Sequence, residues 1–290
     1  MGIQFQQVAI IGVGLIGGSL GLLLRQKGLA DSIVGVGRRK ENLEHAVTMG
    51  AIDRYVTQAK DALEKADLVV LATPVDTYET HVREWRGWLR PPTIVMDVGS
   101  VKGKLVEQLE NHMPAGVRFV GTHPIAGREK SGVAYALPDL FQGARCIVTP
   151  TSRTDPKALA IVQHLWEAAG STVMSMDPLT HDWVFGAVSH LPHVVSFSLM
   201  WALQEVQRQT SVPIDLLNFS GGGLKDTTRI AASSPEMWRD ICLANDQNLI
   251  QMIDIYTQCL QHFKTLLETK DRCELEKELE RAKETRDRLG

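Results

Sequence analysis

Three glycines near the amino terminus, Gly12, Gly14 and Gly17, stand between an apolar run over 7–11 and a helical pattern over 15–27. In a G-x-G-x-x-G turn the first glycine permits the bend, the second lets the backbone approach a pyrophosphate, and the third lets the helix pack on the strand. Free N–H groups at the helix N-terminus favour the anion. Dinucleotide contacts are expected from the residues of this turn: Gly12, Gly14, Leu15, Ile16 and Gly17. The alternative is that the glycines serve packing alone.

The second apolar run, over 32–36, is followed by Arg38 and Arg39, with no acidic residue between Asp31 and Glu41. An NAD site normally places Asp or Glu here to hold the ribose 2′-hydroxyl, whereas guanidinium groups suit a 2′-phosphate. The pattern therefore favours NADP over NAD as the cofactor. The alternative is that Arg38 only stacks on the adenine while NAD is used.

His123 comes just past an expected strand, over 118–122, in the segment Gly-Thr-His-Pro-Ile-Ala-Gly. Loops beyond the carboxyl ends of parallel strands are where ligands bind in such sheets. A neutral imidazole can take a hydroxyl proton while a hydride leaves the same carbon. His123 could be a general base or a purely structural histidine, and the residue alone does not decide between the two; the family resemblance given below implies the catalytic role.

His190 and His193 are three residues apart, so a helix would place both on one face. They form either a polar cluster facing a cleft or a pair of buried, hydrogen-bonded histidines. A third and a fourth ligand are missing nearby, so we expect no metal site. The four cysteines are scattered without a C-x-x-C pair, which is typical of reduced thiols in a cytoplasmic protein.

The elements that must position these residues alternate between short apolar runs and helical patterns. This order predicts a Rossmann-type doubly wound α/β domain with a parallel sheet buried on both faces. The expected strands are 7–11, 32–36, 68–72, 93–98, 118–122, 144–149 and 172–176. The expected helices are 15–27, 41–49, 60–66, 104–112 and 156–169, the last with Asp155 as its N-cap.

After Asp177 the strand signals stop and helical patterns continue to the C-terminus. We therefore predict a dinucleotide-binding domain over 1–177 and an all-α substrate and dimerisation domain over 178–290. Pro192 and Pro213 are expected to break helices in the second domain, and Pro235 to open one.

Length and composition limit the remaining classes of function. The 290 residues suit two domains, and 44% hydrophobic with 22% charged residues is ordinary for a soluble globular protein. The net charge of −3 argues against nucleic acid as a partner. The uncharged stretch 8–24 is at the lower limit of membrane-spanning length and rich in glycine, so we expect a strand and a helix there and no membrane partner.

Several segments together resemble the prephenate/arogenate dehydrogenase family of tyrosine biosynthesis. They are GVGLIGGSL, LATP, DVGSVKG, GTHPIAGREKSG, VSHLPH, GGGLKDTTRIA and MWRD, in order from residue 12 to about residue 240. The resemblance implies NAD(P)-dependent oxidative decarboxylation of prephenate to 4-hydroxyphenylpyruvate and CO2, or of arogenate to tyrosine. It also implies a homodimer formed through the C-terminal helices, where apolar residues are frequent over 194–201.

The resemblance also assigns roles to individual residues. It implies that Ser100 lies near His123 and the nicotinamide, and that Thr73 and Pro74 contact the cofactor. It implies that Arg229 binds a substrate carboxylate. The remaining substrate-site residues that it implies are His190, His193, Gly222, Asp226, Trp238 and Glu129, the last at the mouth of the pocket.

Each assignment has an ordinary structural alternative. Ser100 could only cap the following helix, Trp238 could belong to a core, and Arg229 could lie on a surface helix; the glycines at 221–223 suggest a close-approach turn beside it. Two other classes of protein compete for the whole chain: a Rossmann dehydrogenase for another hydroxy acid or imino acid, and a nucleotide sensor without turnover. Prephenate tested against hydroxy acids with NADP would separate them.

Overall fold

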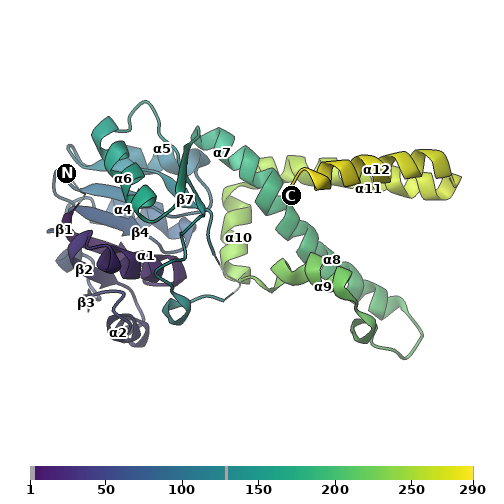
Figure 1. Ribbon diagram of the computed structural model, residues 1–290, viewed down its shortest axis with the longest axis horizontal. Helices are drawn as coiled ribbons and strands as arrows, with labels where there is room; N and C mark the ends of the chain where they lie inside the picture. Colours follow the sequence, from purple (N-terminus) through teal and green to yellow (C-terminus); the bar gives the residue numbers. More distant parts are fainter. Residues whose placement is uncertain (1–3, 128–129, 290) are drawn as a thin grey trace. The chain divides into compact units, whose positions relative to one another are not determined.

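The protein is described here by a computed structural model that covers residues 4–127 and 130–289 (Figure 1). It divides into two compact units, residues 1–245 and 246–290. The first unit contains a parallel sheet with strand order β3-β2-β1-β4-β5-β6. Its strands are β1 (Phe5–Ile11), β2 (Ala30–Val36), β3 (Arg54–Val56), β4 (Leu68–Leu71), β5 (Ile94–Asp97) and β6 (Arg118–Val120).

Side chains alternate along β1 between two hydrophobic clusters, one on each face of the sheet. Val8 and Ile10 belong to the cluster that includes α1, α2 and α6, whereas Ala9 and Ile11 belong to the cluster that includes α3, α4 and α5. Those helices are α1 (Leu15–Gln26), α2 (Lys40–Thr48), α3 (Lys60–Leu63), α4 (Tyr78–Trp85), α5 (Gly103–His112) and α6 (Pro156–Ala168). Burial on both faces explains the uninterrupted apolar strands and confirms the doubly wound Rossmann-type fold.

The run 118–122 is not one strand, and this corrects the prediction. β6 ends at Val120, and β7 (Thr122–Pro124) joins a second sheet with β8 (Arg145–Val148) and β9 (Thr172–Ser175). β7 pairs antiparallel with β8, so His123 lies within a strand opposite Ile147, and not in a loop. The chain changes sheet at Gly121, where an added Cβ would be 2.4 Å from the Oγ1 of Thr149.

Asp155 caps α6 as predicted, because its carboxylate accepts a hydrogen bond of 2.8 Å from the backbone N of Ala158. The helices of the first unit continue with α7 (Pro178–Phe185), α8 (Leu191–Gln209), α9 (Gly222–Thr228) and α10 (Pro235–Ala244). Pro235 opens α10 as expected, and Pro213 lies in the non-helical segment between α8 and α9.

Pro192 does not break a helix, which corrects a second expectation. A π-helical turn over Gly186–His190 joins α7 to α8, and Pro192 follows it in the first turn of α8. A π-turn changes the register of the backbone hydrogen bonds, so the N–H that proline lacks is not needed in the usual i−4 bond.

The continuous helical stretch Pro178–Gln209 is long and apolar enough to cross a membrane by length and composition. A single such helix is weak evidence for a membrane, and this one carries His181, Asp182 and His190 buried inside the first unit. The apolar segment 8–24, by contrast, forms β1 and α1.

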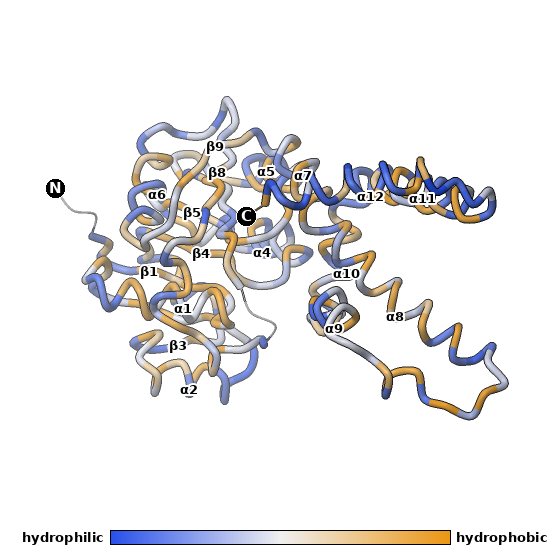
Figure 2. Tube along the Cα trace, turned by 45° about the vertical axis from the view of Figure 1, so that its right-hand side comes forward, coloured by the Kyte–Doolittle hydropathy of each residue, from blue (hydrophilic) through white to orange (hydrophobic). Residues whose placement is uncertain are grey.

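The second unit is a pair of helices, α11 (Asp246–Thr269) and α12 (Arg272–Asp287). Lys270 in the turn between them has a positive φ of 55°, and the Asp271 side chain caps α12. Hydrophilic residues dominate α12, whereas hydrophobic residues recur along α11 (Figure 2).

Candidate active site

The glycine-rich turn has the geometry that a phosphate-binding turn requires. Gly12 has a φ of +96°, and an added Cβ there would be 2.6 Å from the carbonyl oxygen of Ala72. An added Cβ at Gly17 would be 2.2 Å from the carbonyl oxygen of Gly12, whereas one at Gly14 would meet nothing within 4 Å. Gly14 is also the N-cap of α1 and supplies no side-chain cap, so the first N–H groups of the helix stay available to an anion. The residues present therefore fit a dinucleotide.

Other residues predicted to contact the cofactor also follow strand ends. Arg38 and Arg39 come after β2, are both exposed, and precede α2, of which Arg39 is the N-cap. Thr73 and Pro74 follow β4, and the Thr73 hydroxyl is 2.7 Å from the hydroxyl of Thr77. The carboxyl ends of parallel strands share one edge, so these positions lie at the same edge as the glycine turn.

His123 is joined to two residues that the sequence analysis did not identify. Its Nδ1 is 2.9 Å from Nε2 of His181, and Nδ1 of His181 is 2.8 Å from Oδ1 of Asp182. His181 is fully buried and Asp182 is 4% exposed, whereas His123 is partly exposed. Phe185 packs against both imidazoles, with ring centroids 4.8 and 4.4 Å away. The three residues form a continuous His-His-Asp chain that ends at a partly accessible imidazole.

Burial keeps both histidines of this chain neutral. It holds the pKa of His123 well below its ordinary value of 6.5, and the positive charge of Lys102 acts in the same direction. The pKa of His181 is also lowered by burial, although its hydrogen bond to Asp182 acts in the opposite direction. At neutral pH His123 is therefore a free base that can accept a proton.

A buried ion pair between Lys102 and Asp97 lies at the carboxyl end of β5. The Asp97 carboxylate also accepts hydrogen bonds from the backbone N–H groups of Gly99 and Thr122, at 2.9 and 3.1 Å. Ser100 lies in this loop and is partly exposed. Ser100 does not cap the next helix. Lys102 is the N-cap of α5, and no side-chain cap hydrogen bond is formed there. The helix-cap alternative for Ser100 is therefore wrong.

The structure brings His190, His193 and Trp238 together. The ring of His193 stacks on the Trp238 indole with centroids 3.6 Å apart, and His190 meets the same indole edge-on at 6.0 Å. Trp238 is 6% exposed and packs with Val101 and Ile241. Trp238 is thus a core residue and a neighbour of both histidines, so the two interpretations of it are compatible.

His190 presents a polar atom that has no protein partner among the described residues. The Asn245 amide nitrogen is 3.0 Å from Nδ1 of His190 and donates to the carbonyl oxygen of Asp182 at 2.8 Å. With Nδ1 accepting, neutral His190 carries its proton on Nε2, which is buried without a hydrogen-bond partner in residues 4–127 and 130–289. Burial lowers the pKa of His190 to about 4.

The predicted carboxylate-binding segment lies on α9 and just after it. Arg229 ends α9 and is exposed, and its positive charge lowers the pKa of His193, after the larger effect of burial. Asp226 and Gly222 are exposed on the same helix. An added Cβ at Gly221 or Gly223 would meet nothing within 4 Å, so the expected close-approach turn is not formed within the described chain. Glu129 lies outside the described residues.

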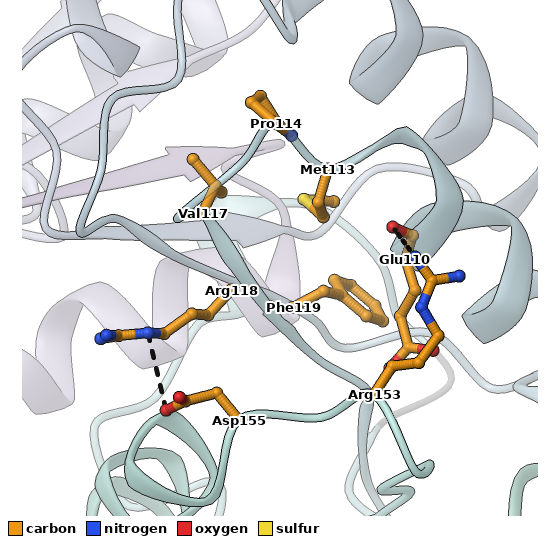
Figure 3. A pocket seen from close by; sticks show the side chains of 8 residues that line it. All are labelled: Glu110, Met113, Pro114, Val117, Arg118, Phe119, Arg153 and Asp155. Atoms are coloured by element: carbon orange, nitrogen blue, oxygen red, sulfur yellow. Dashed lines mark hydrogen bonds and ion pairs between the residues drawn. The ribbon is translucent and has the colours of Figure 1, made fainter.

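A surface pocket elsewhere in the first unit does not belong to this group. It lies at the amino-terminal end of β6, the edge opposite the glycine turn, beside the start of α6 (Figure 3). Its two arginines are engaged: Arg118 pairs with Asp155 at 3.6 Å, and Arg153 donates to the carbonyl oxygen of Glu110 at 3.2 Å. Over the described ranges, no three His, Cys, Asp or Glu side chains are placed to hold a metal ion.

Sequence reasoning missed four residues of the site: Asp97, Lys102, His181 and Asp182. One signal was present for Asp97, a carboxylate that directly ends a fully apolar strand. Another was the adjacent His181 and Asp182, in the first helix after the last strand. Their connection to His123 spans 58 positions and could not be found from spacing.

Comparison with known proteins finds relatives over nearly the whole chain. The family model for the prephenate dehydrogenase nucleotide-binding domain matches residues 20–175, and the model for the dimerization domain matches residues 177–281. Prephenate dehydrogenase of Bacillus subtilis is 34% identical over 283 residues, which cover 97% of this chain and 76% of that protein. Cyclohexadienyl dehydrogenase of Zymomonas mobilis is 31% identical over 268 residues, covering 92% of this chain and 90% of that protein.

A solved structure supports the same relationship. The crystal structure of prephenate dehydrogenase from A. aeolicus in complex with hydroxyphenyl propionate and NAD+ has a TM-score of 0.93. Its sequence is 41% identical to this one, and the alignment covers 100% of both chains. Sequence, fold and the order of the two matched regions agree, and the chain belongs to the prephenate dehydrogenase family.

Proposed function

We propose that this protein catalyses the NADP-dependent oxidative decarboxylation of prephenate to 4-hydroxyphenylpyruvate and CO2. One observation carries the proposal: a neutral, partly accessible His123 ends a buried His-His-Asp chain, at the sheet edge that also holds the glycine-rich turn. Relatives named prephenate dehydrogenase and cyclohexadienyl dehydrogenase support the substrate class.

The glycine-rich turn would hold the cofactor, which would supply the acceptor for the hydride that leaves the ring carbon carrying the hydroxyl group. His123 would take the hydroxyl proton as that carbon becomes a ketone. The bond to the ring carboxylate then breaks, CO2 leaves, and its electron pair makes the ring aromatic with negative charge on the former hydroxyl oxygen. The protonated His123 can return its proton to that oxygen, so the reaction has no net proton release.

The other residues bind and orient the substrate in this proposal. Arg229 pairs with a substrate carboxylate, because a planar guanidinium can bind it with two parallel hydrogen bonds. His190 offers its unpartnered Nε2–H to a substrate oxygen, beside His193 and Trp238. Ser100 is proposed near the base and the nicotinamide, Glu129 and Asp226 at the entrance, and Gly222 at the substrate site.

The test is a steady-state assay of reduced cofactor formation with purified protein. We expect turnover with prephenate and NADP, a smaller kcat/KM with arogenate, and a loss of about 10²–10⁴-fold in kcat for His123→Asn with cofactor affinity unchanged. The exposed His164→Asn on α6 is the matched control.

Normal turnover of His123→Asn would remove His123 from the mechanism, and turnover of other hydroxy acids in place of prephenate would support a different dehydrogenase. Cofactor binding without turnover of any substrate would support the nucleotide sensor.

The cofactor preference rests on Arg38 and Arg39, which follow β2 where an NAD enzyme normally carries an acid. We expect Arg38→Asp to lower kcat/KM for NADP and to raise it for NAD, because an aspartate repels a 2′-phosphate and accepts a bond from a 2′-hydroxyl. The A. aeolicus relative was crystallised with NAD+, so the comparison must include both cofactors. A clear preference of the unmodified protein for NAD would refute this part of the proposal.

A homodimer would cover apolar side chains that single-chain packing leaves exposed. Val188, Trp201 and Phe219 are 67%, 68% and 75% exposed, and the family model over residues 177–281 describes a dimerization domain. We propose a second copy of this chain as the occupant, with the domain boundary at Asp177. Analytical ultracentrifugation should give twice 32.1 kDa, and Trp201→Glu should shift the equilibrium toward monomer. A monomer, or binding to lipid vesicles in place of dimerisation, would contradict the proposal.

The cellular location is proposed to be cytoplasmic. The four cysteines are all unpaired, and two of them, Cys259 and Cys273, are exposed. Exposed free thiols suit a reducing compartment. Cell fractionation with an antibody against the protein would test this, and recovery in an oxidising compartment would refute it.

A further inference from the structure

We propose that His181 and Asp182 are a positioning pair for His123: they fix the tautomer in which Nε2 can accept a proton, and they stabilise the positive charge that then arrives. The proposal rests on the proposed function, in which His123 is the base. Neither residue was predicted from the sequence, and both are buried on α7, 58 and 59 positions after His123.

The direction of the hydrogen bonds follows from the carboxylate. An ionised carboxylate only accepts, so Nδ1 of His181 must donate to Oδ1 of Asp182. Neutral His181 then has its lone pair on Nε2. This nitrogen must accept a hydrogen bond from the N–H at Nδ1 of His123. Neutral His123 consequently carries its proton on Nδ1, which leaves Nε2 as the only ring nitrogen able to act as a base.

Asp182 is itself held in place by the start of α5. Its Oδ1 also accepts a hydrogen bond of 2.7 Å from the backbone N of Lys102. An added Cβ at Gly103 would be 2.5 Å from Oδ2, so only glycine admits the carboxylate at this distance. Oδ1 thus accepts from both the backbone of Lys102 and the His181 ring, and Gly103 packs against Oδ2, so the carboxylate is held in the orientation that fixes the His181 tautomer.

The charge balance explains why a carboxylate is needed. A proton on Nε2 makes His123 cationic in a buried region that already contains the Lys102 ammonium. Asp97 forms the ion pair with Lys102 and is therefore already matched. Asp182 is connected to His123 through the hydrogen bonds of His181. Its negative charge stabilises the His123 imidazolium until the proton is transferred to the product.

Two substitutions separate the charge from the geometry. Asp182→Asn keeps an oxygen that can accept from both His181 and the backbone of Lys102, but it removes the negative charge. His181→Gln places an amide oxygen near the position of Nε2, so it can accept from His123 but cannot connect it to Asp182. Asp177→Asn is the matched control. Asp177 caps the same helix by accepting from the backbone N of Leu179 and Thr180, and it takes no part in the His-His-Asp hydrogen bonds.

The experiment is a double-mutant cycle on kcat with prephenate, run on the full-length protein. We expect Asp182→Asn alone and His181→Gln alone each to lower kcat by about tenfold or more, with Asp177→Asn unchanged. In the His181→Gln background, Asp182→Asn should change kcat by less than about twofold, because Asp182 acts only through His181. Equal losses in both backgrounds would mean that Asp182 acts through α5, and that result would overturn the proposal.

A spectroscopic measurement keeps the proposal testable without turnover. The 15N shifts of labelled histidines report which ring nitrogen carries the proton, and His123→Asn assigns the His123 signals. The unmodified protein should show His123 protonated on Nδ1, and His181→Phe should yield a mixture of tautomers. His123 protonated on Nε2 in the unmodified protein would refute the pair even if the enzyme is active. Absence of prephenate turnover with the expected tautomer would refute the proposed function alone.

Discussion

His190 should make the stability of the first unit depend on pH by an amount that can be calculated. The residue is 1% exposed, and burial lowers its pKa from 6.5 to about 4, although the negative charge of Asp182 acts in the opposite direction. The unfolded chain therefore binds a proton at higher pH than the folded one. The free energy of unfolding must fall as the pH drops from about 6.5 toward 4.

The two pKa values give the size of this effect. Relative to pH 8, protonation of His190 in the unfolded chain lowers the free energy of unfolding by about 2 kcal/mol at pH 5 and about 3 kcal/mol at pH 4. His190→Asn is the appropriate variant, since the asparagine oxygen can occupy the position of Nδ1 and accept from Asn245. It stays uncharged at every pH.

The assay is urea unfolding of both proteins at one fixed protein concentration, at intervals between pH 8 and pH 5. The variant is expected to be less stable at pH 8 because it fills less of the buried site. The difference between the two proteins should shrink by about 2 kcal/mol by pH 5, because only the unmodified protein loses the His190 contribution. If the two curves stay parallel over this range, His190 does not titrate as its burial requires and the reasoning fails.

Three further substitutions test other parts of the structure. Arg229→Ala should raise KM for prephenate by several-fold or more and change kcat less, since the contact forms before the reaction; an unchanged KM would place the carboxylate elsewhere. Asp155→Ala should lower the free energy of unfolding by about 1 kcal/mol through the lost cap of α6, whereas the exposed Lys157→Ala should change it by less than about 0.5 kcal/mol. Gly17→Ala should weaken NADP binding at least about tenfold, because its Cβ would lie 2.2 Å from the Gly12 carbonyl oxygen and displace the turn; unaltered binding, measured by calorimetry, would contradict this.

Elements with a strong local pattern could be predicted from the sequence. β1 and α1 agree with their expected bounds to within two residues, because apolar runs and glycine spacing are local signals. β3 was missed because three residues, Arg54–Val56, are too short to carry a pattern. α4 was also missed, since only Tyr78 and Val82 of its eight residues are buried and the rest are mostly polar. Its helical form depends on packing against the sheet more than on propensity.

The break at Gly121 could not be predicted, because its cause is not local. The strand expected over 118–122 includes Gly121, but the backbone N of Thr149 donates to the carbonyl oxygen of Gly121 at 2.9 Å. Thr122 instead donates to the carboxylate of Asp97, so the ladder with β5 ends there. Both partners are 25 or more positions away, and neither has a spacing that indicates a contact.

The same distant contacts decide where the candidate base lies. Asp97 ends β5, accepts the Thr122 backbone N–H that turns the chain into β7, and pairs with Lys102 at the start of α5. The backbone of Lys102 in turn binds Asp182, which anchors His181 and through it His123. A motif that includes His123 can therefore indicate a base. The tautomer and the charge of His123 depend on Asp182, 59 positions further on, and only the fold brings these two residues together.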